Sequence, residues 1–363
     1  MNRQTTTTYS RRLSKLRGLI EQRKLDALLV TSLPNVHYLT GFSGSAGVLL
    51  VGLRRSFFFS DPRYDLQAHE EVEDSKVEIV RGDALAAAAK QATRSRCSRL
   101  GFEADTISFL TYRRLRELLP SKGRVATSGL VESLRLEKDA EEIERIRQAV
   151  ELASRAFSET LPMIRPGIRE LDVAAEIEYR MRLMGGERPA FETIVASGPR
   201  TALPHAHAGN RLLRSNECIL MDLGVILNGY ASDMTRTVFL GNAPRKAAKI
   251  YGAVLEAQLA AEEVVRAGIE CSRVDAAARQ VLARHGYDSY FTHSTGHGLG
   301  REVHEMPRVA AKQQTPLPER AVITVEPGVY IPGYGGVRIE DVVVVRKQGA
   351  EVLTPTSKQL TVL

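Results

Sequence analysis

The segment from Cys218 to Leu240 constrains the fold more than any other part of the chain. It consists of two apolar runs separated by the dipeptide Asn228-Gly229. Asn-Gly is the strongest short-range signal for a β-hairpin, because both central residues of a type I′ turn take positive φ. A two-residue turn places Leu227 opposite Tyr230 and thereby sets the register of the whole hairpin.

That register brings two carboxylates together. Asp222 lies opposite Thr235, and Asp233 lies two residues before Thr235 on the second strand. Diagonal neighbours of this kind point to one face of the hairpin, about 7 Å apart. Like charges placed in this way repel each other unless a proton or a cation lies between them. The alternative, a solvated loop position, suits Asp233 taken alone but not Asp222, which directly follows an apolar run.

A second pair of carboxylates lies near the end of the chain. Glu326 ends one apolar run, Glu340 stands just before the apolar run 342–345, and a Gly-rich reversal at 332–336 separates them. Charged groups beside apolar strands are rarely buried unless they are paired or bind a metal. A salt bridge to Arg338 is therefore the alternative to a metal site.

Histidines gather in the stretch 293–304. His293, His297 and His304 lie there, out of eight histidines in the chain, and His297 is flanked by Gly296 and Gly298. Glycines beside a ligand permit a close approach of the backbone. The pattern is not the H-E-x-x-H helix of zinc peptidases, because the second histidine is missing.

Together these segments predict a site for two divalent cations. The candidate ligands are four carboxylates and one imidazole: Asp222, Asp233, His297, Glu326 and Glu340. Two neighbouring metal ions are a known hydrolytic arrangement. A donor set dominated by oxygen favours Mn²⁺, with Co²⁺ or Zn²⁺ as alternatives.

The chain is expected to form two domains. Its first third alternates short apolar runs with helical patterns, which is typical of an α/β layer domain. A long amphipathic helix follows, with one apolar stripe formed by Ile143, Ile146, Val150, Ala153 and Phe157. Beyond it, helical patterns at 170–184 and 246–267 separate strand-rich segments, which favours an α+β domain with antiparallel sheets. We place the boundary at residue 135, giving domains 1–135 and 136–363.

Composition bears on compartment and partners. The three cysteines form no C-x-x-C pair and, being odd in number, suit no disulfide framework, so we expect a reducing, cytoplasmic setting. No apolar run approaches the roughly 20 residues that span a bilayer, and the polar N-terminus has no apolar signal core. The net charge of the whole chain is +7. Its positive excess lies in residues 1–136, which hold 22 Lys and Arg against 14 Asp and Glu. No nucleic-acid recognition motif accompanies this charge, so we expect neither a nucleic-acid partner nor a membrane.

At this point the motifs resemble those of the pita-bread metallopeptidases, the family of methionine aminopeptidase, prolidase and aminopeptidase P. The matching motifs are the Asp222…Asp233 hairpin, Gly296-His297-Gly298, Val303-His304-Glu305-Met306-Pro307, Glu326-Pro327-Gly328 and Arg338-Ile339-Glu340-Asp341. The resemblance implies a pita-bread α+β catalytic domain whose five matching residues bind two metals. It also implies that Glu326 is the general base and that His205, His293, His304 and Arg338 contact substrate. Whether Arg338 instead orients ligand carboxylates stays open.

The first domain narrows the resemblance. The stretch 38–47 (YLTGFSGSAG) and Asp61-Pro62-Arg63-Tyr64 resemble the creatinase-like N-terminal domain of Xaa-Pro aminopeptidases, although the family usually has Gly where Pro62 stands. We therefore expect an aminopeptidase that cleaves the N-terminal Xaa-Pro bond of proline-containing peptides by a metal-bridging hydroxide, with His304 donating to the tetrahedral intermediate. An Xaa-Pro dipeptidase is the alternative, and a non-enzymatic binding protein on the same fold is a third. The family also suggests a homodimer or a higher homo-oligomer.

Overall fold

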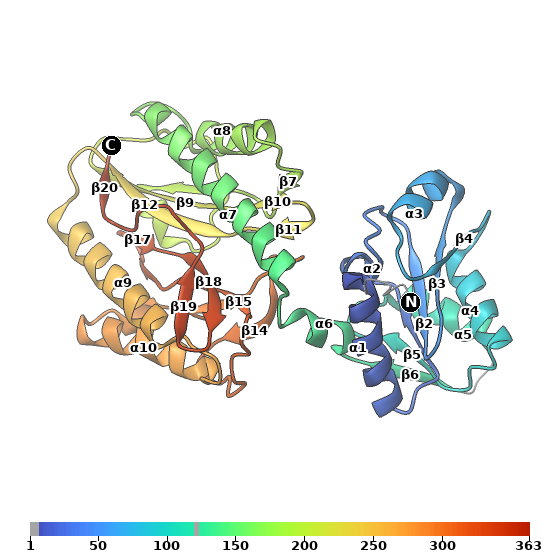
Figure 1. The fold of residues 1–363 in the computed structure, drawn as a ribbon. Helices are drawn as coiled ribbons and strands as arrows, with labels where there is room; N and C mark the ends of the chain where they lie inside the picture. Colours follow the sequence, from blue (N-terminus) through green and yellow to red (C-terminus); the bar gives the residue numbers. More distant parts are fainter. Residues whose placement is uncertain (1–6, 120–122) are drawn as a thin grey trace, which may run out of the picture. The chain divides into compact units, whose positions relative to one another are not determined.

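The computed structural model describes residues 7–119 and 123–363. The chain divides into two compact units, Met1–Arg135 and Leu136–Leu363, shown in Figure 1. Among the described residues, no helix is both long enough and apolar enough to cross a membrane.

The first unit is a three-layer α/β structure around one six-stranded sheet of order β4-β3-β2-β1-β5-β6. Its strands are β1 (Ala27–Val30), β2 (Val48–Gly52), β3 (Ser56–Ser60), β4 (Lys76–Ile79), β5 (Leu100–Glu103) and β6 (Arg124–Thr127). Its helices are α1 (Thr8–Gln22), α2 (Leu33–Thr40), η1 (Pro62–Tyr64), α3 (Asp65–Glu71), α4 (Ala84–Arg94), α5 (Phe109–Leu118) and α6 (Leu130–Arg135).

Both faces of this sheet are apolar because alternate residues of each strand point to opposite sides. On β1, Leu28 and Val30 join a cluster with α1, whereas Ala27 and Leu29 join a second cluster with α4 and α5. Figure 1 shows these helices on opposite sides of the sheet. The helical pattern over residues 63–74 divides into η1 and α3, because Pro62 begins a separate 3₁₀ turn.

The second unit is an α+β structure with several small sheets. Its strands are β7 (Arg188–Pro189), β8 (Ile194–Ser197), β9 (Glu217–Leu223), β10 (Val225–Leu227), β11 (Tyr230–Ala231), β12 (Met234–Leu240), β13 (Gly296–Gly298), β14 (Glu305–Val309), β15 (Val322–Val325), β16 (Gly328–Ile331), β17 (Gly335–Arg338), β18 (Asp341–Arg346), β19 (Gly349–Val352) and β20 (Thr361–Val362). Its helices are α7 (Ala140–Thr160), η2 (Leu161–Met163), α8 (Glu170–Leu183), η3 (Gly198–Ala202), α9 (Arg245–Val264), α10 (Cys271–Arg284) and η4 (Asp288–Tyr290).

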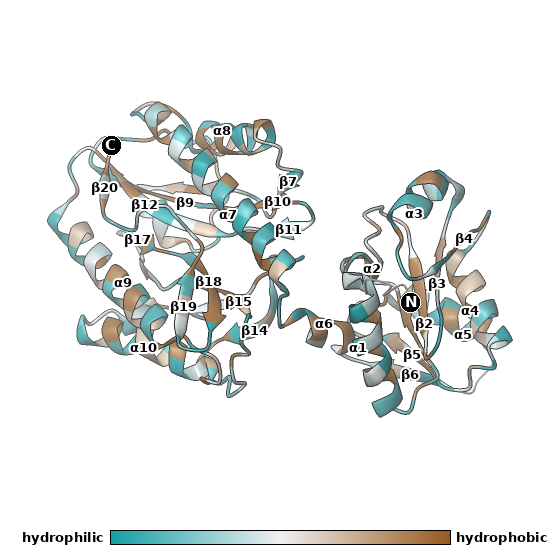
Figure 2. Ribbon diagram, viewed as in Figure 1, coloured by the Kyte–Doolittle hydropathy of each residue, from teal (hydrophilic) through white to brown (hydrophobic). Residues whose placement is uncertain are grey.

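Two helix pairs cover the two larger sheets. Residues of α7 and α8 form one apolar core with the sheet β20-β12-β9-β8. Residues of α9 and α10 form another with the sheet β14-β13-β15-β18-β19. In Figure 2, strands such as β18 are largely brown (hydrophobic), whereas the helices mix hydrophilic and hydrophobic residues. The candidate metal ligands lie at or near the ends of strands in these sheets.

The predicted hairpin register is confirmed. Leu227 pairs with Tyr230 and Asp222 pairs with Thr235, and the turn residues Asn228 and Gly229 have φ of 50° and 70°. The positive φ at both central residues is typical of a type I′ turn, whose twist matches that of the flanking strands and so favours this pairing.

Helix α7 begins at a capping box formed by Asp139 and Glu142, and the five residues of the predicted stripe are all buried. It ends at Thr160, before the Pro166-Gly167 pair that would end a helix by its sequence. Pro162 is the physical reason, because its nitrogen has no hydrogen to donate to the carbonyl four residues earlier and its ring clashes with that carbonyl, so the chain continues as the 3₁₀ turn η2. Helix α10 was not expected at all.

Candidate metal centre

The five candidate ligands come from separate elements of the second unit. Asp222 lies on β9, Asp233 lies between β11 and β12, and His297 lies on β13. Glu326 directly follows β15, and Glu340 lies between β17 and β18. The backbone N–H of Glu340 donates to the carbonyl of Thr235 at 3.1 Å, which joins segments more than a hundred residues apart.

Ligand atoms of these residues converge. His297 Nε2 lies 3.6 Å from Asp233 Oδ2 and 3.4 Å from Glu326 Oε1. One ligand atom each of Asp233, His297 and Glu340 lies within 4.8 Å of the other two. Asp233 and Glu340 are 5% and 1% exposed, so this density of carboxylates is shielded from water.

Asp222 is close enough for its charge to act on Asp233 and Glu340. Its Oδ2 accepts a hydrogen bond from Arg338 Nη2 at 2.6 Å. Its Oδ1 is buried and has no hydrogen-bond partner among the described residues. A buried carboxylate oxygen without a partner costs free energy, so a cation at this atom fits the donor set.

The electrostatics of the cluster point the same way. Burial raises the pKa of Asp233 well above its usual range, and the charges of Glu340 and Asp222 add to the effect. Burial likewise raises the pKa of Glu340, with the charge of Glu326 as the next cause. Burial raises the pKa of Glu326 to about 7. Without cations these groups hold protons, and divalent cations would take the place of those protons.

Two threonines that sequence reasoning missed orient the carboxylates. Thr235 Oγ1 donates to Glu340 Oε2 at 2.7 Å and accepts from Arg338 Nε at 2.9 Å. Thr324 Oγ1 accepts from the His297 N–H at 3.1 Å and donates to Glu326 Oε1 at 3.3 Å. The available signal was a hydroxyl inside an apolar strand beside a carboxylate.

A third missed residue, Tyr330, links Arg338 to His293. The Tyr330 hydroxyl accepts from Arg338 Nη1 at 2.8 Å and lies 2.8 Å from His293 Nε2. Arg338 Nη1 also donates to the Pro204 carbonyl at 3.2 Å. Burial, followed by the charge of Arg338, lowers the pKa of His293 to about 4. In sequence, Tyr330 cannot be distinguished from a core aromatic residue.

The last two predicted residues, His205 and His304, are exposed at the rim. The rings of His304 and His297 have centroids 4.4 Å apart and meet edge to face. His205 follows Pro204, and its charge contributes to lowering the pKa of His293 and of His304, although burial is the largest cause for both. All predicted site residues therefore belong to one region of the second unit.

The chain matches two protein-family models. Residues 144–347 match the model of metallopeptidase family M24, and residues 12–136 match the creatinase/prolidase N-terminal domain. The chain belongs to metallopeptidase family M24. The resemblance seen in the sequence, to a creatinase-like domain followed by a pita-bread catalytic domain, is confirmed.

Three M24 relatives illustrate the likeness. The Xaa-Pro dipeptidase from Bacillus anthracis has a structure with a TM-score of 0.95, 38% identity, and coverage of 98% of this chain and 100% of that chain. The Xaa-Pro dipeptidase of Pyrococcus furiosus is 37% identical over 96% of this chain and 99% of its own length. The X-Pro aminopeptidase from Thermotoga maritima has a TM-score of 0.89 and 36% identity, covering 94% of this chain and 99% of that chain.

Proposed function

We propose that this M24 metallopeptidase is an Xaa-Pro dipeptidase, in which residues 136–363 form the catalytic domain and residues 1–135 the N-terminal domain. The carrying observation is the buried cluster of four carboxylates and one imidazole. Relatives named Xaa-Pro dipeptidase support the dipeptide preference, so our first expectation, an aminopeptidase, becomes the second candidate. The likeness to an X-Pro aminopeptidase structure keeps that candidate in the test.

Asp222, Asp233, His297, Glu326 and Glu340 would hold two divalent ions. The oxygen-rich donor set favours Mn²⁺, and the unpartnered Oδ1 of Asp222 supports the fit. Such ions, when bound, polarise a carbonyl and lower the pKa of bound water.

Glu326 is proposed as the general base. Its Oε1 faces His297 and Thr324, which leaves Oε2 to hold the proton taken from the attacking water. The same oxygen then passes this proton to the proline nitrogen as the Xaa-Pro bond breaks.

The remaining residues bind and orient. Arg338 donates to Asp222, Thr235, Tyr330 and Pro204, which favours an orienting role for it over direct contact with substrate. His304, at the rim, would donate to the oxygen that becomes negatively charged. His205 and His293 would line the side that receives proline, whose ring removes the N–H that ordinary peptidases recognise.

A length series of substrates tests the proposal. Purified protein supplied with Mn²⁺ is assayed on Ala-Pro, on Ala-Pro-Ala-Ala, and on Ala-Ala as a control without proline. We expect cleavage of Ala-Pro well above that of the other two. Cleavage of the tetrapeptide alone would establish the aminopeptidase instead, and no cleavage by metal-loaded protein would overturn both.

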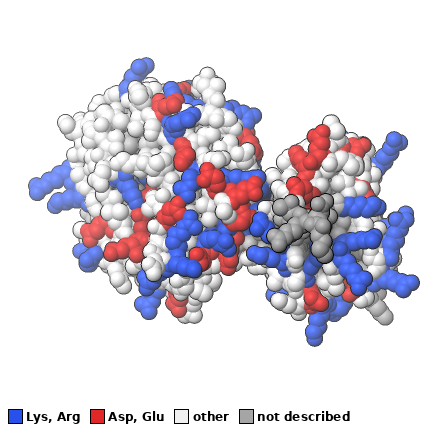
Figure 3. Space-filling model, in the orientation of Figure 1, with Lys and Arg blue, Asp and Glu red and all other residues white. Residues whose placement is uncertain are grey.

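Two further expectations remain proposals. Cys97, Cys218 and Cys271 are all free thiols, which supports a cytoplasmic setting, and the family suggests a homo-oligomer. The visible face of the first unit carries many Lys and Arg side chains (Figure 3). That charge would attract the carboxylates of short peptides.

A further inference from the structure

The segment from Phe291 to His297 carries two site histidines but is irregular until β13 begins at Gly296. Its first residues therefore have no sheet partners to place them, and their backbone groups must be satisfied elsewhere. The elements that do this lie outside the candidate metal centre, on α10.

Arg279 of α10 holds two carbonyls of this segment. Its Nη1 donates to the Phe291 carbonyl at 3.0 Å and its Nη2 to the His293 carbonyl at 2.6 Å. The guanidinium carbon also lies 4.3 Å from the centre of the Phe291 ring. A planar fork of donors suits two carbonyls that are two residues apart.

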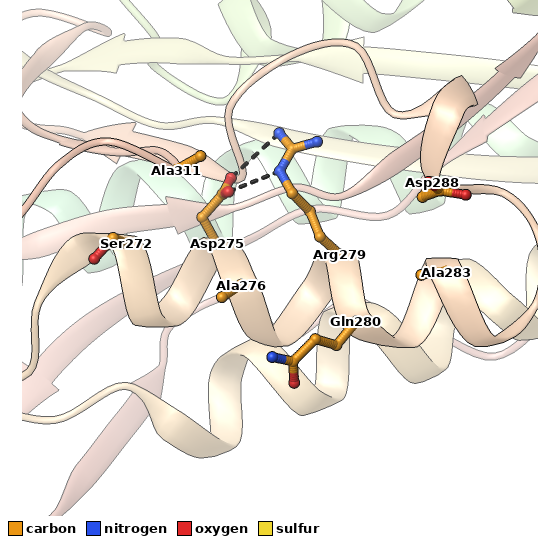
Figure 4. A pocket seen from close by; sticks show the side chains of 8 residues that line it. All are labelled: Ser272, Asp275, Ala276, Arg279, Gln280, Ala283, Asp288 and Ala311. Atoms are coloured by element: carbon orange, nitrogen blue, oxygen red, sulfur yellow. Dashed lines mark hydrogen bonds and ion pairs between the residues drawn. The ribbon is translucent and has the colours of Figure 1, made fainter.

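Asp275, one helical turn earlier, holds the next part of the segment. Its Oδ1 accepts from the Thr295 N–H at 3.2 Å and from Thr295 Oγ1 at 2.8 Å. Its Oδ2 accepts from Arg279 Nε at 2.7 Å. Figure 4 shows the two side chains joined to each other above the helix. Asp275 is fully buried, whereas the Arg279 side chain is one-third exposed.

The pair thus anchors the backbone at residues 291, 293 and 295. The ring of His293 is then placed between two further contacts: its Nε2 lies 2.8 Å from the Tyr330 hydroxyl, and the Phe291 ring meets it edge-on at 5.0 Å. A cavity of about 430 Å³ borders the pair and is also lined by Ala276 and Ala311 (Figure 4).

We propose that Asp275 and Arg279 are a positioning pair that sets the place of His293 in the substrate site. The proposal deepens the proposed function and rests on it. A buried ion pair that served stability alone could be replaced by apolar residues of similar size. Here the remaining donors of Arg279 and the remaining acceptor of Asp275 all bind one segment, the one that carries His293.

A double-mutant cycle tests whether the pair acts through His293. We expect Arg279→Ala to lower kcat/KM for Ala-Pro by about 10- to 100-fold, the scale of loss from a displaced group. In a His293→Ala background the same change should cost less than about twofold, because coupled residues are not additive. Equal losses in both backgrounds would overturn the proposal.

Two variants separate positioning from charge and from general stability. Arg279→Lys keeps the charge but not the fork, so we expect a loss similar to that of Arg279→Ala; wild-type kinetics in this variant would overturn the proposal. The matched control is Arg180→Ala on α8, since Arg180 pairs with Glu176 one turn away and is 28% exposed. That control should keep wild-type kinetics.

Hydrogen exchange of the metal-free protein provides a readout that needs no activity. The Thr295 amide should exchange faster in Arg279→Lys and in Asp275→Asn than in wild type, and at the wild-type rate in Arg180→Ala. Unchanged exchange in both variants would overturn the proposal. Faster exchange in a protein that cleaves no Xaa-Pro bond would support the positioning pair and reject only the proposed function.

Discussion

The residues of the candidate metal centre carry more negative than positive charge. Burial makes this excess costly in free energy. Asp233 and Glu340 lie almost out of reach of water. The buried cations near them are already paired, Arg338 with Asp222 and Arg236 with Asp341. After burial, the charges of Glu340, Asp222 and Glu326 raise the pKa of Asp233, and those of Glu326 and Asp222 raise the pKa of Glu340. If these residues bind cations as proposed, they do so at the expense of the stability of the metal-free protein.

Replacing Asp233 should separate these two effects. Asp233→Asn should lower kcat/KM by more than about 100-fold, since loss of even an outer partner of a metal ligand costs about 10- to 100-fold. In metal-free protein at pH 8 the same change should raise the free energy of unfolding, by about 1.4 kcal/mol for each pKa unit of relieved repulsion. Denaturant unfolding with and without Mn²⁺ measures this. Glu263→Gln on the exposed face of α9 is the control, and a less stable metal-free Asp233→Asn would contradict the argument.

Tyr330 is the residue-scale link between Arg338 and His293. Tyr330→Phe leaves His293 Nε2 without this partner, so we expect a loss of about 1–3 kcal/mol in stability. Because His293 then loses its hydrogen-bond partner at Nε2, KM for Ala-Pro should rise more than kcat falls. Tyr334→Phe in the adjoining turn should change neither quantity. An unaltered KM in Tyr330→Phe would contradict the proposal that His293 lines the substrate side.

At the scale of elements, the site depends on turns and strand ends rather than on any one helix. The turn at Asn228-Gly229 sets which residues of β9 and β12 face each other. The β16–β17 reversal returns the chain from Glu326 to Glu340. Each turn therefore controls a pair of candidate ligands.

Replacing each of two glycines with alanine should change the stability of the protein in opposite directions. Gly229 has a φ of 70°, so Gly229→Ala should destabilise the protein by about 1–2 kcal/mol. Gly252, in the exposed interior of α9, has no atom within 4 Å of an added Cβ, so Gly252→Ala should stabilise it by about 0.5–1 kcal/mol. Denaturant midpoints measure both changes. A stabilising Gly229→Ala would mean that the turn is not of type I′.

At the scale of the whole molecule, pH acts on metal-free protein through two opposing sets of groups. Burial lowers the pKa of His293, His297 and His304 below 6.5, so their contribution to stability rises with pH up to that value. Burial raises the pKa of Asp233, Glu326 and Glu340, so their contribution falls as pH rises, because the folded chain then binds more protons than the unfolded chain.

As pH rises past 6.5 the contribution of these histidines levels off, whereas that of the three carboxyl groups continues to fall. We therefore expect the melting temperature of metal-free protein to fall as pH rises from 6.5 through about 7, the pKa of Glu326. Mn²⁺ should abolish the fall, because metal binding requires the deprotonated ligands. Thermal unfolding across this range, with Asp233→Asn as a variant of smaller slope, measures the effect. A melting temperature that rose over the same range without metal would contradict the assignment of the raised pKa values.

Local chemistry made part of this protein readable from its residues alone. The Asn228-Gly229 turn predicted the pairing of Asp222 with Thr235, and the apolar stripe of α7 predicted its buried face. Both follow from neighbours in the chain, whose spacing the backbone itself imposes. The five candidate ligands stood out for a related reason, since carboxylates beside apolar strands need a partner.

Only the tertiary structure decided which distant groups meet. Arg338 could have paired with Glu326 or Glu340 in its own segment, yet it pairs with Asp222 from β9. The roles of Tyr330 and Thr235, and the hold of α10 on the segment before His297, also involve residues far apart in sequence. Their side chains are ordinary for a strand or a helix surface. Such contacts come from the way separate layers pack over their cores, and no local pattern in the chain records that packing.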